Sequence, residues 1–125
     1  MSATEWHSGG CHCGRVRFRA RFRSWDALDC NCSICKKKGF LHAIVPRDDF
    51  ELSSGAELLS SYEFNTKTAK HRFCSICGAH AFYTPRSHPD RVDVNVRCLD
   101  GELAGRFVVQ AFDGENWEDN VEAIR

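Results

Sequence analysis

The feature that most constrains this chain is a loop with three cysteines inside six residues, Cys30, Cys32 and Cys35. Three thiols this close together cannot all form disulfides with one another. Thiolates at such short spacings can instead converge on one soft metal ion, and we expect zinc because it accepts sulfur ligands and has no redox chemistry. Structural zinc sites usually have four protein ligands, whereas catalytic ones often keep three and leave a position for water or substrate. This loop supplies three.

Two further pairs of cysteines lie in short turns that each end in glycine. Cys11 and Cys13 form a CxCG turn, and Cys74 and Cys77 form a CxxCG turn. The glycine lets the backbone take a positive φ, so that amide N–H groups can point at the sulfurs. Two such half-sites make one closed centre of four cysteines, which would hold the first strand to the middle of the chain. The three-cysteine loop then remains as a second, open centre.

Spacing also allows another division of the thiols between two metal ions. One ion could take Cys11, Cys13, Cys30 and Cys32, and the other Cys35, Cys74, Cys77 and Cys98. We favour the first division because it keeps the tight local cluster on one ion. Cys98 decides the character of the second centre: as a fourth ligand it would close the site, whereas alone it is more often a small buried hydrophobic residue. Judged by spacing, a structural role for the second centre is favoured over a catalytic one.

Length and charge bound the class of protein. Residues 1–125 are expected to form a single domain with one modest hydrophobic core. Lysine and arginine (17) balance aspartate and glutamate (17), so no basic excess favours nucleic acid as a partner. The apolar stretches are too short for a membrane span, and residues 1–10 lack the pattern of a secretory signal. The predicted location is the cytoplasm, where thiols stay reduced and serve as metal ligands; in an exported protein the disulfide interpretation would return.

Short extended segments, punctuated by glycine and proline, predict a mainly β fold. The segments are residues 15–23, 40–45, 50–52, 58–64, 70–73, 79–84, 91–97 and 107–112, with a turn at 65–67 and at most a short helix near Ala56 or the C-terminus. In segment 91–97 the valines alternate with Asp93 and Asn95. A period of two predicts that the valines point inward and the two polar residues outward.

The first of these segments carries a stripe of arginines. Val16, Phe18, Ala20 and Phe22 alternate with five arginines, at positions 15, 17, 19, 21 and 23. The arginine face could bind an anionic ligand, because guanidinium groups recognise carboxylates and phosphates well. The commoner use of such a face is solvation or a set of salt bridges to neighbouring strands, and both interpretations are carried forward.

Five segments together resemble the glutathione-dependent formaldehyde-activating enzyme family, which includes centromere-associated (CENP-V-like) relatives. They are residues 10–18, 30–35, 73–78, 83–89 and 94–100, in the family's order over nearly the whole chain. The resemblance implies the family's Mss4-like fold of short antiparallel strands and two zinc ions. Its structural zinc would fall on Cys11, Cys13, Cys74 and Cys77, and its catalytic zinc on Cys30, Cys32 and Cys35. Cys98 lies outside both sets, which favours the open second centre.

The activity that the resemblance implies is that of an S-(hydroxymethyl)glutathione synthase, a carbon–sulfur lyase that joins formaldehyde to the thiol of glutathione. An open zinc suits this chemistry, because the metal favours the thiolate form of a bound thiol at neutral pH. The alternative is a non-catalytic zinc module that uses the arginine stripe to bind an anionic macromolecule, since one fold can host different functions.

The other polar residues of these segments carry no assigned role. Lys36, Lys37 and Lys38 could offset the negative charge of the second centre or meet the carboxylates of glutathione, but such runs are more often solvated turns. Proton transfer or support of a ligand is conceivable for His12, His42, His71 and His80. No histidine is singled out by its spacing, so surface or packing roles are favoured. Asn95 and Arg97 are left without a role.

Overall fold

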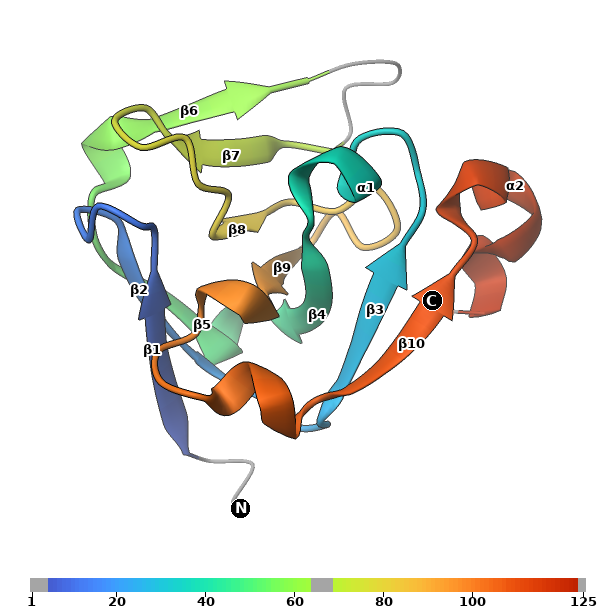
Figure 1. Ribbon diagram of the computed structural model, residues 1–125, viewed down its shortest axis with the longest axis horizontal. Helices are drawn as coiled ribbons and strands as arrows, with labels where there is room; N and C mark the ends of the chain where they lie inside the picture. The colour runs from blue at the N-terminus through green and yellow to red at the C-terminus, as the bar shows by residue number, and fades with distance from the viewer. Residues whose placement is uncertain (1–4, 64–68, 124–125) are drawn as a thin grey trace.

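The computed structural model describes residues 5–63 and 69–123, and its strands form three sheets within those ranges (Figure 1). The first sheet has the order β1-β2-β5, with β1 at Trp6–Gly10, β2 at Arg17–Arg21 and β5 at Phe50–Ser54. The second has the order β10-β3-β4-β9-β8, made of Val108–Phe112, Asp26–Cys30, Leu41–Pro46, Arg91–Asn95 and Phe82–Tyr83. The third pairs β6 (Leu59–Tyr62) with β7 (His71–Cys74).

Helices are short. Helix α1 spans Cys35–Lys38 and ends at Gly39 in the left-handed conformation, and α2 spans Trp117–Asn120. Single 3-10 turns occupy Arg47–Asp49, Ala56–Leu58, Val96–Cys98, Leu103–Arg106, Gly114–Asn116 and Val121–Ala123. None of the helices in the described ranges is long and apolar enough to cross a membrane.

The mainly β prediction is confirmed, and the strand pairs are antiparallel except that β10 runs parallel to β3. The helix expected near Ala56 is a 3-10 turn. Strands β1 and β3 and helix α1 were not predicted, because their sequences are polar or rich in cysteine and carry no clear period. The end of predicted segment 58–64 and the turn at 65–67 lie outside the described residues.

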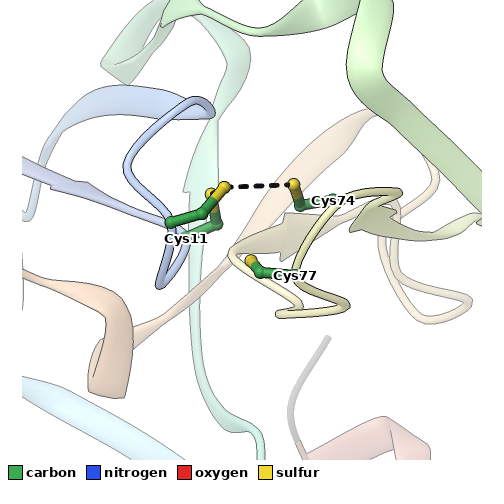
Figure 2. A group of neighbouring side chains, drawn as sticks. Cys11, Cys74 and Cys77 are labelled. Atoms are coloured by element: carbon green, nitrogen blue, oxygen red, sulfur yellow. Dashed lines mark hydrogen bonds between the residues drawn. The ribbon is translucent and has the colours of Figure 1, made fainter.

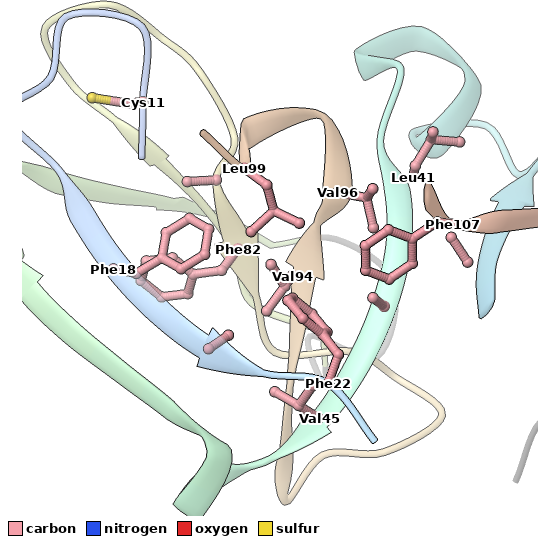
Figure 3. Packing of buried hydrophobic residues seen from close by; sticks show 14 of the residues in the cluster. Cys11, Phe18, Phe22, Leu41, Val45, Phe82, Val94, Val96, Leu99 and Phe107 are labelled. Atoms are coloured by element: carbon pink, nitrogen blue, oxygen red, sulfur yellow. The ribbon is translucent and has the colours of Figure 1, made fainter. Parts of the chain in front are cut away.

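The main core lies between the first and second sheets (Figure 3). The alternation of β2 is confirmed: Val16, Phe18, Ala20 and Phe22 are all buried. Phe18 stacks on Phe50 of β5, with ring centroids 5.5 Å apart, and meets Phe82 of β8 at 6.4 Å. Val94 and Val96 belong to the same core cluster and are fully buried. Strand β9 is thus fixed on its valine face by the main core.

The opposite face of β9 corrects a prediction. Asp93 and Asn95 were expected to point into solvent, yet both are buried, with 1% and 6% of their surface exposed. Asn95 accepts hydrogen bonds from the backbone N–H groups of Leu41 and Arg97 and donates to the carbonyl of His80. Asp93 bonds to His42. The sheet is therefore covered on both sides, which alternation in one strand cannot reveal.

The arginine stripe is paired with carboxylates. The pairs are Arg17 with Asp100, Arg19 with Glu51, Arg21 with Asp49 and Arg23 with Asp49. Arg15 instead lies beside Cys13, and its hydrogen bond contributes to a lowered pKa of that thiol. The salt-bridge interpretation of the stripe is confirmed, and the arginines have protein partners without an external anion.

Asp49 provides a test of this pairing. Its carboxylate is 3% exposed and receives Arg21 and Arg23, each at 3.0 Å. Replacing it by asparagine removes a charge that joins two hydrogen bonds, so we expect Asp49→Asn to lower the free energy of unfolding by about 2 kcal/mol. The matched control is Glu51→Gln, whose pair with Arg19 is exposed and should contribute less than about 1 kcal/mol. Urea unfolding of both variants checks this; equal losses would contradict it.

Candidate metal centres and their cavity

The first centre joins two turns that are far apart in the sequence. Cys11 and Cys13 follow β1, and Cys74 and Cys77 come from the end of β7 and the turn after it. Their four sulfurs all lie within 4.8 Å of one another, with Cys13 Sγ 3.5 Å from Cys11 Sγ and 3.7 Å from Cys74 Sγ. Figure 2 shows the thiols of Cys11, Cys74 and Cys77 facing one another across the gap between the turns. This is a closed set of four donors.

The glycines of these turns work as predicted. Gly14 and Gly78 have φ of 81° and 78°, in the left-handed region. The backbone N–H of Val16 donates to Cys11 Sγ at 3.4 Å. Backbone hydrogen bonds from Ala79 and Cys13 lower the pKa of Cys77 to about 6. These hydrogen bonds favour the thiolate of Cys77, the form that binds a metal ion, whereas burial raises the pKa of Cys11.

The second centre gathers the thiols of Cys30, Cys32 and Cys35. Cys30 ends β3, Cys35 begins α1, and Cys32 lies in the loop between them. The backbone N–H of Cys35 donates to Cys32 Sγ at 3.4 Å. Hydrogen bonds with the other two thiols lower the pKa of Cys32 to about 2, and the same contacts raise the pKa of Cys30 and Cys35. The contacts with Cys30 and Cys35 thus stabilise a thiolate at Cys32.

A histidine that spacing did not single out joins this centre. Among the described residues the donor group there is Cys30, Cys35 and His42, and the predicted ligand Cys32 contacts the two thiols from outside that group. One ring nitrogen of His42 lies within 4.8 Å of both Cys30 Sγ and Cys35 Sγ, and the sulfurs are equally close to each other. The register explains why: His42 on β4 is opposite Leu28 on β3, so it shares a face with Cys30 two residues further on. The signal in the sequence would have been the pairing of β3, and β3 was not predicted.

A cavity of about 370 Å³ opens beside the second centre. Its wall includes all three thiols together with His42, His71, Tyr83 and Asp93, and its more exposed residues include Arg86, Glu115 and Glu118. Burial raises the pKa of Tyr83, and burial lowers the pKa of His71 to about 4. Near pH 7 the cavity therefore presents a protonated phenol and a neutral imidazole next to the thiols. This is room for a small molecule with a polar group.

The chemistry of the two donor sets suits a metal ion. Four sulfurs in the first centre, and sulfurs with an imidazole nitrogen in the second, are the donors of soft and borderline metals. The Nε2 atom of His42 is buried and has no hydrogen-bond partner among residues 5–63 and 69–123, so a bound metal ion would satisfy it. Gly114 also leaves space: a Cβ there would lie 2.2 Å from Cys30 Sγ.

Gly114 gives a prediction for this centre. Gly114→Ala would push a methyl group into the thiol of Cys30 and approach Cys32 Cβ at 3.1 Å. We expect metal affinity at the second centre to fall about 10-fold or more, because thiols displaced from a common point hold an ion poorly. Metal titration with a chromophoric chelator measures this. Gly105→Ala is the control, since a Cβ at that position meets nothing within 4 Å; equal affinities in the two variants would contradict the prediction.

The three lysines that follow the second centre do not all face solvent. Lys36 and Lys37 are exposed, and Lys36 faces Glu115 at 3.7 Å. Lys38 instead turns inward, with Nζ 3.0 Å from His71 Nδ1 and 4.3 Å from the ring centre of Tyr83. The alternative division of thiols is wrong, because Cys11, Cys13, Cys74 and Cys77 form one group.

Cys98 and the other histidines lie apart from the two donor groups. Cys98 donates to the carbonyl of His80 at 3.6 Å, and burial raises its pKa to about 11. It belongs to neither of the donor groups found among the described residues and is a partly buried residue packed against the main core. His12 is exposed on the CxCG turn, and His80 packs against Phe73.

Comparison with known proteins decides the family. The model of the family described as glutathione-dependent formaldehyde-activating enzyme matches residues 6–114, a range that contains both centres. The chain belongs to this family. The fold agrees: a crystal structure of a Rhodobacter sphaeroides protein superposes with a TM-score of 0.71 at 40% sequence identity, covering 75% of this chain and 88% of that chain.

A curated member of the glutathione-dependent formaldehyde-activating enzyme family is also similar in sequence. The Halomonas elongata protein named "Putative glutathione-dependent formaldehyde-activating enzyme" is 30% identical over 104 residues. The alignment covers 76% of this chain and 66% of that protein, so the chain spans just under two thirds of the relative's length.

Proposed function

We propose that this chain is a zinc-dependent carbon–sulfur lyase that joins formaldehyde, or a similarly small aldehyde, to the thiol of glutathione. The observation that carries the proposal is the second centre: three cysteines that line a cavity of about 370 Å³, inside a chain of the formaldehyde-activating family. A closed structural centre would not need a cavity against its sulfurs.

In this proposal the two centres have different roles. Cys11, Cys13, Cys74 and Cys77 hold a structural zinc that fixes the CxCG turn to the end of β7. Cys30, Cys32 and Cys35 hold a second zinc that favours the thiolate of a bound thiol at neutral pH. Residues 1–125 act as one domain, and the reducing cytoplasm keeps the eight free cysteines available for metal.

The residues of the cavity would position the two substrates. The reaction forms a bond between the sulfur of the thiolate and the carbon of formaldehyde, and the carbonyl oxygen takes up a proton. Tyr83 keeps its proton because burial raises its pKa, so its hydroxyl can donate a hydrogen bond within the cavity. Lys38, beside His71, brings a positive group near the thiolates. Arg86 on the same wall carries a guanidinium suited to a carboxylate of glutathione, in exchange for its present partner Glu118.

The pairing of the arginine stripe favours this function over the binding module. A surface that recruits an anionic macromolecule needs cations that the partner can neutralise. Arg17, Arg19, Arg21 and Arg23 already contact carboxylates of the same chain. Binding through that stripe would first have to break these ion pairs.

The direct test is the exchange of formaldehyde between its free and glutathione-bound forms. Exchange spectroscopy with ¹³C-formaldehyde measures the rate in buffer, with zinc ion alone, and with the zinc-loaded protein. The proposal predicts a rate with protein that exceeds both references and saturates with glutathione. S-methylglutathione, which lacks the thiol, should give no adduct. A rate with protein equal to that of zinc ion alone would overturn the proposal.

A further inference from the structure

The proposed function assigns no role to the Nε2 atom of His42. This side chain is 6% exposed, and its Nε2 atom has no hydrogen-bond partner in the part of the chain that the structure describes. Leaving a buried polar atom unpaired costs about 1–3 kcal/mol, so such an atom in a folded protein calls for an explanation. A packing role, which the sequence analysis favoured, does not provide one.

The other nitrogen of His42 is firmly held. Its Nδ1 lies 2.6 Å from Oδ2 of Asp93, a carboxylate that is itself 1% exposed. Asp93 sits on β9 opposite Ile44, two residues along β4 from His42, so both side chains project from the same face of the sheet. Because a carboxylate only accepts, Nδ1 must carry the proton. In the neutral ring Nε2 then has a free lone pair.

The imidazole ring that carries the Nε2 lone pair lies at the second centre. A nitrogen of His42 lies within 4.8 Å of the sulfurs of Cys30 and Cys35, and Nδ1 is already taken by Asp93. A histidine that binds a metal ion almost always donates its other N–H to a carboxylate, carbonyl or water, which fixes the tautomer. The Asp93–His42 pair has that arrangement.

We propose that His42 is a protein donor of the second centre, binding its metal ion through Nε2, and that Asp93 is the positioning residue that fixes the tautomer. This inference rests on the proposed function in that it assumes a metal ion at Cys30, Cys32 and Cys35. With His42 the substrate-free centre has three sulfurs and one nitrogen. Glutathione would then compete with a side chain for the fourth position instead of displacing a water molecule.

Two other residues of the cavity fit the role less well. His71 is also buried, but its Nδ1 contacts Lys38 Nζ at 3.0 Å and its ring stacks on Tyr83. Tyr83 brings its hydroxyl to 3.3 Å from Nδ1 of His42, on the side of the ring away from Nε2. In the search of the described residues neither belongs to a donor group with the thiols of the second centre, so His71 serves as the matched control.

The test is long-range ¹H–¹⁵N correlation of the histidine side chains in the full-length protein loaded with zinc. We expect the Nε2 resonance of His42 to have the chemical shift of a metal-bound nitrogen and its Nδ1 that of a protonated one. Removal of zinc by a chelator should return Nε2 to the shift of an unprotonated free nitrogen. Added glutathione, but not S-methylglutathione, should do the same while zinc remains bound.

Variants provide a second readout by Co²⁺ substitution. His42→Gln should change the ligand-field bands of the second Co²⁺ and weaken its binding at least 10-fold. Asp93→Asn should weaken binding 10- to 100-fold and disturb the tautomer seen in the ¹⁵N spectrum. His71→Gln should leave the Co²⁺ spectrum unchanged. The wild-type ¹⁵N spectrum needs no variant, so a variant that fails to fold does not remove the test.

The outcomes separate this inference from the proposed function. If the wild-type protein binds two metal ions and the ¹⁵N shift of His42 is the same with and without zinc, His42 is not a donor and the lyase proposal stands. If the protein binds only one metal ion, at the first centre, the proposed function and this inference fall together. If His42→Gln and His71→Gln change the Co²⁺ spectrum equally, the role assigned to His42 is wrong.

Discussion

Cys74→Ser is expected to abolish cooperative folding of this protein. The Cys74 thiol is 1% exposed and joins β7 to the CxCG turn after β1 through the first centre. Structural zinc sites contribute about 10–16 kcal/mol to folding, and losing even a third of that approaches the about 5–15 kcal/mol of a typical domain. Circular dichroism during urea or thermal unfolding should show no folded baseline, and zinc analysis should show the first ion lost.

Cys98→Ser is the control for the removal of a thiol. Cys98 is partly buried and contacts only the carbonyl of His80 among the polar contacts of its side chain that the structure describes. Its replacement should cost about 1 kcal/mol, within the usual range for a single substitution. A Cys74→Ser protein that keeps the wild-type unfolding midpoint would show that the first centre is not a structural metal site.

Cys32→Ser should have the second large effect, on binding and not on folding. Cys32 lies in the loop before α1 and packs with a small cluster, Cys30, Cys35 and Phe112, apart from the main core. Its neighbouring thiols lower the pKa of the Cys32 thiol, so serine there removes a thiolate that the proposal assigns to the second zinc. We expect the zinc content to fall from two ions to one. Glutathione affinity should fall more than about 100-fold, because losing a metal ligand costs more than the 10- to 100-fold loss typical of a residue that only supports a ligand.

The folded state separates the two cysteine variants. Cys32→Ser should keep the wild-type circular dichroism spectrum and a cooperative unfolding transition, because β3 and β4 are held by the sheet on either side of the loop. The activity measured by formaldehyde exchange should drop to the rate of buffer. If Cys32→Ser and Cys74→Ser collapse equally, the two centres do not have separate roles.

Local spacing predicted the thiol clusters, and the reason is geometric. CxC, CxxC and a following glycine bring donors together within a few residues, so only the pairing of the CxCG turn with the CxxCG turn needed the tertiary fold. The alternation of Phe18 and its neighbours likewise predicted β2, because its residues divide cleanly between core and paired arginines.

The part of the site that depends on sheet register was missed. His42, Asp93 and Cys30 lie on three different strands and share a face only because β4 is paired with both β3 and β9. Strand β3 begins with aspartate and has no β-branched residue, so its pairing came from its neighbours and not from its own propensity. Asp93 looked like an outward residue because alternation distinguishes two faces of a strand but does not say which of them another element covers.

The measurement that tests the central claim most directly is isothermal titration of glutathione into the zinc-loaded protein, with S-methylglutathione as the control. If the thiols of the second centre and the cavity beside them form a glutathione site, glutathione should give saturable heat at one site per chain. S-methylglutathione should give little or none, because its sulfur cannot become a thiolate. Equal binding of the two ligands would place recognition away from the metal, and no heat from either would remove glutathione as the substrate.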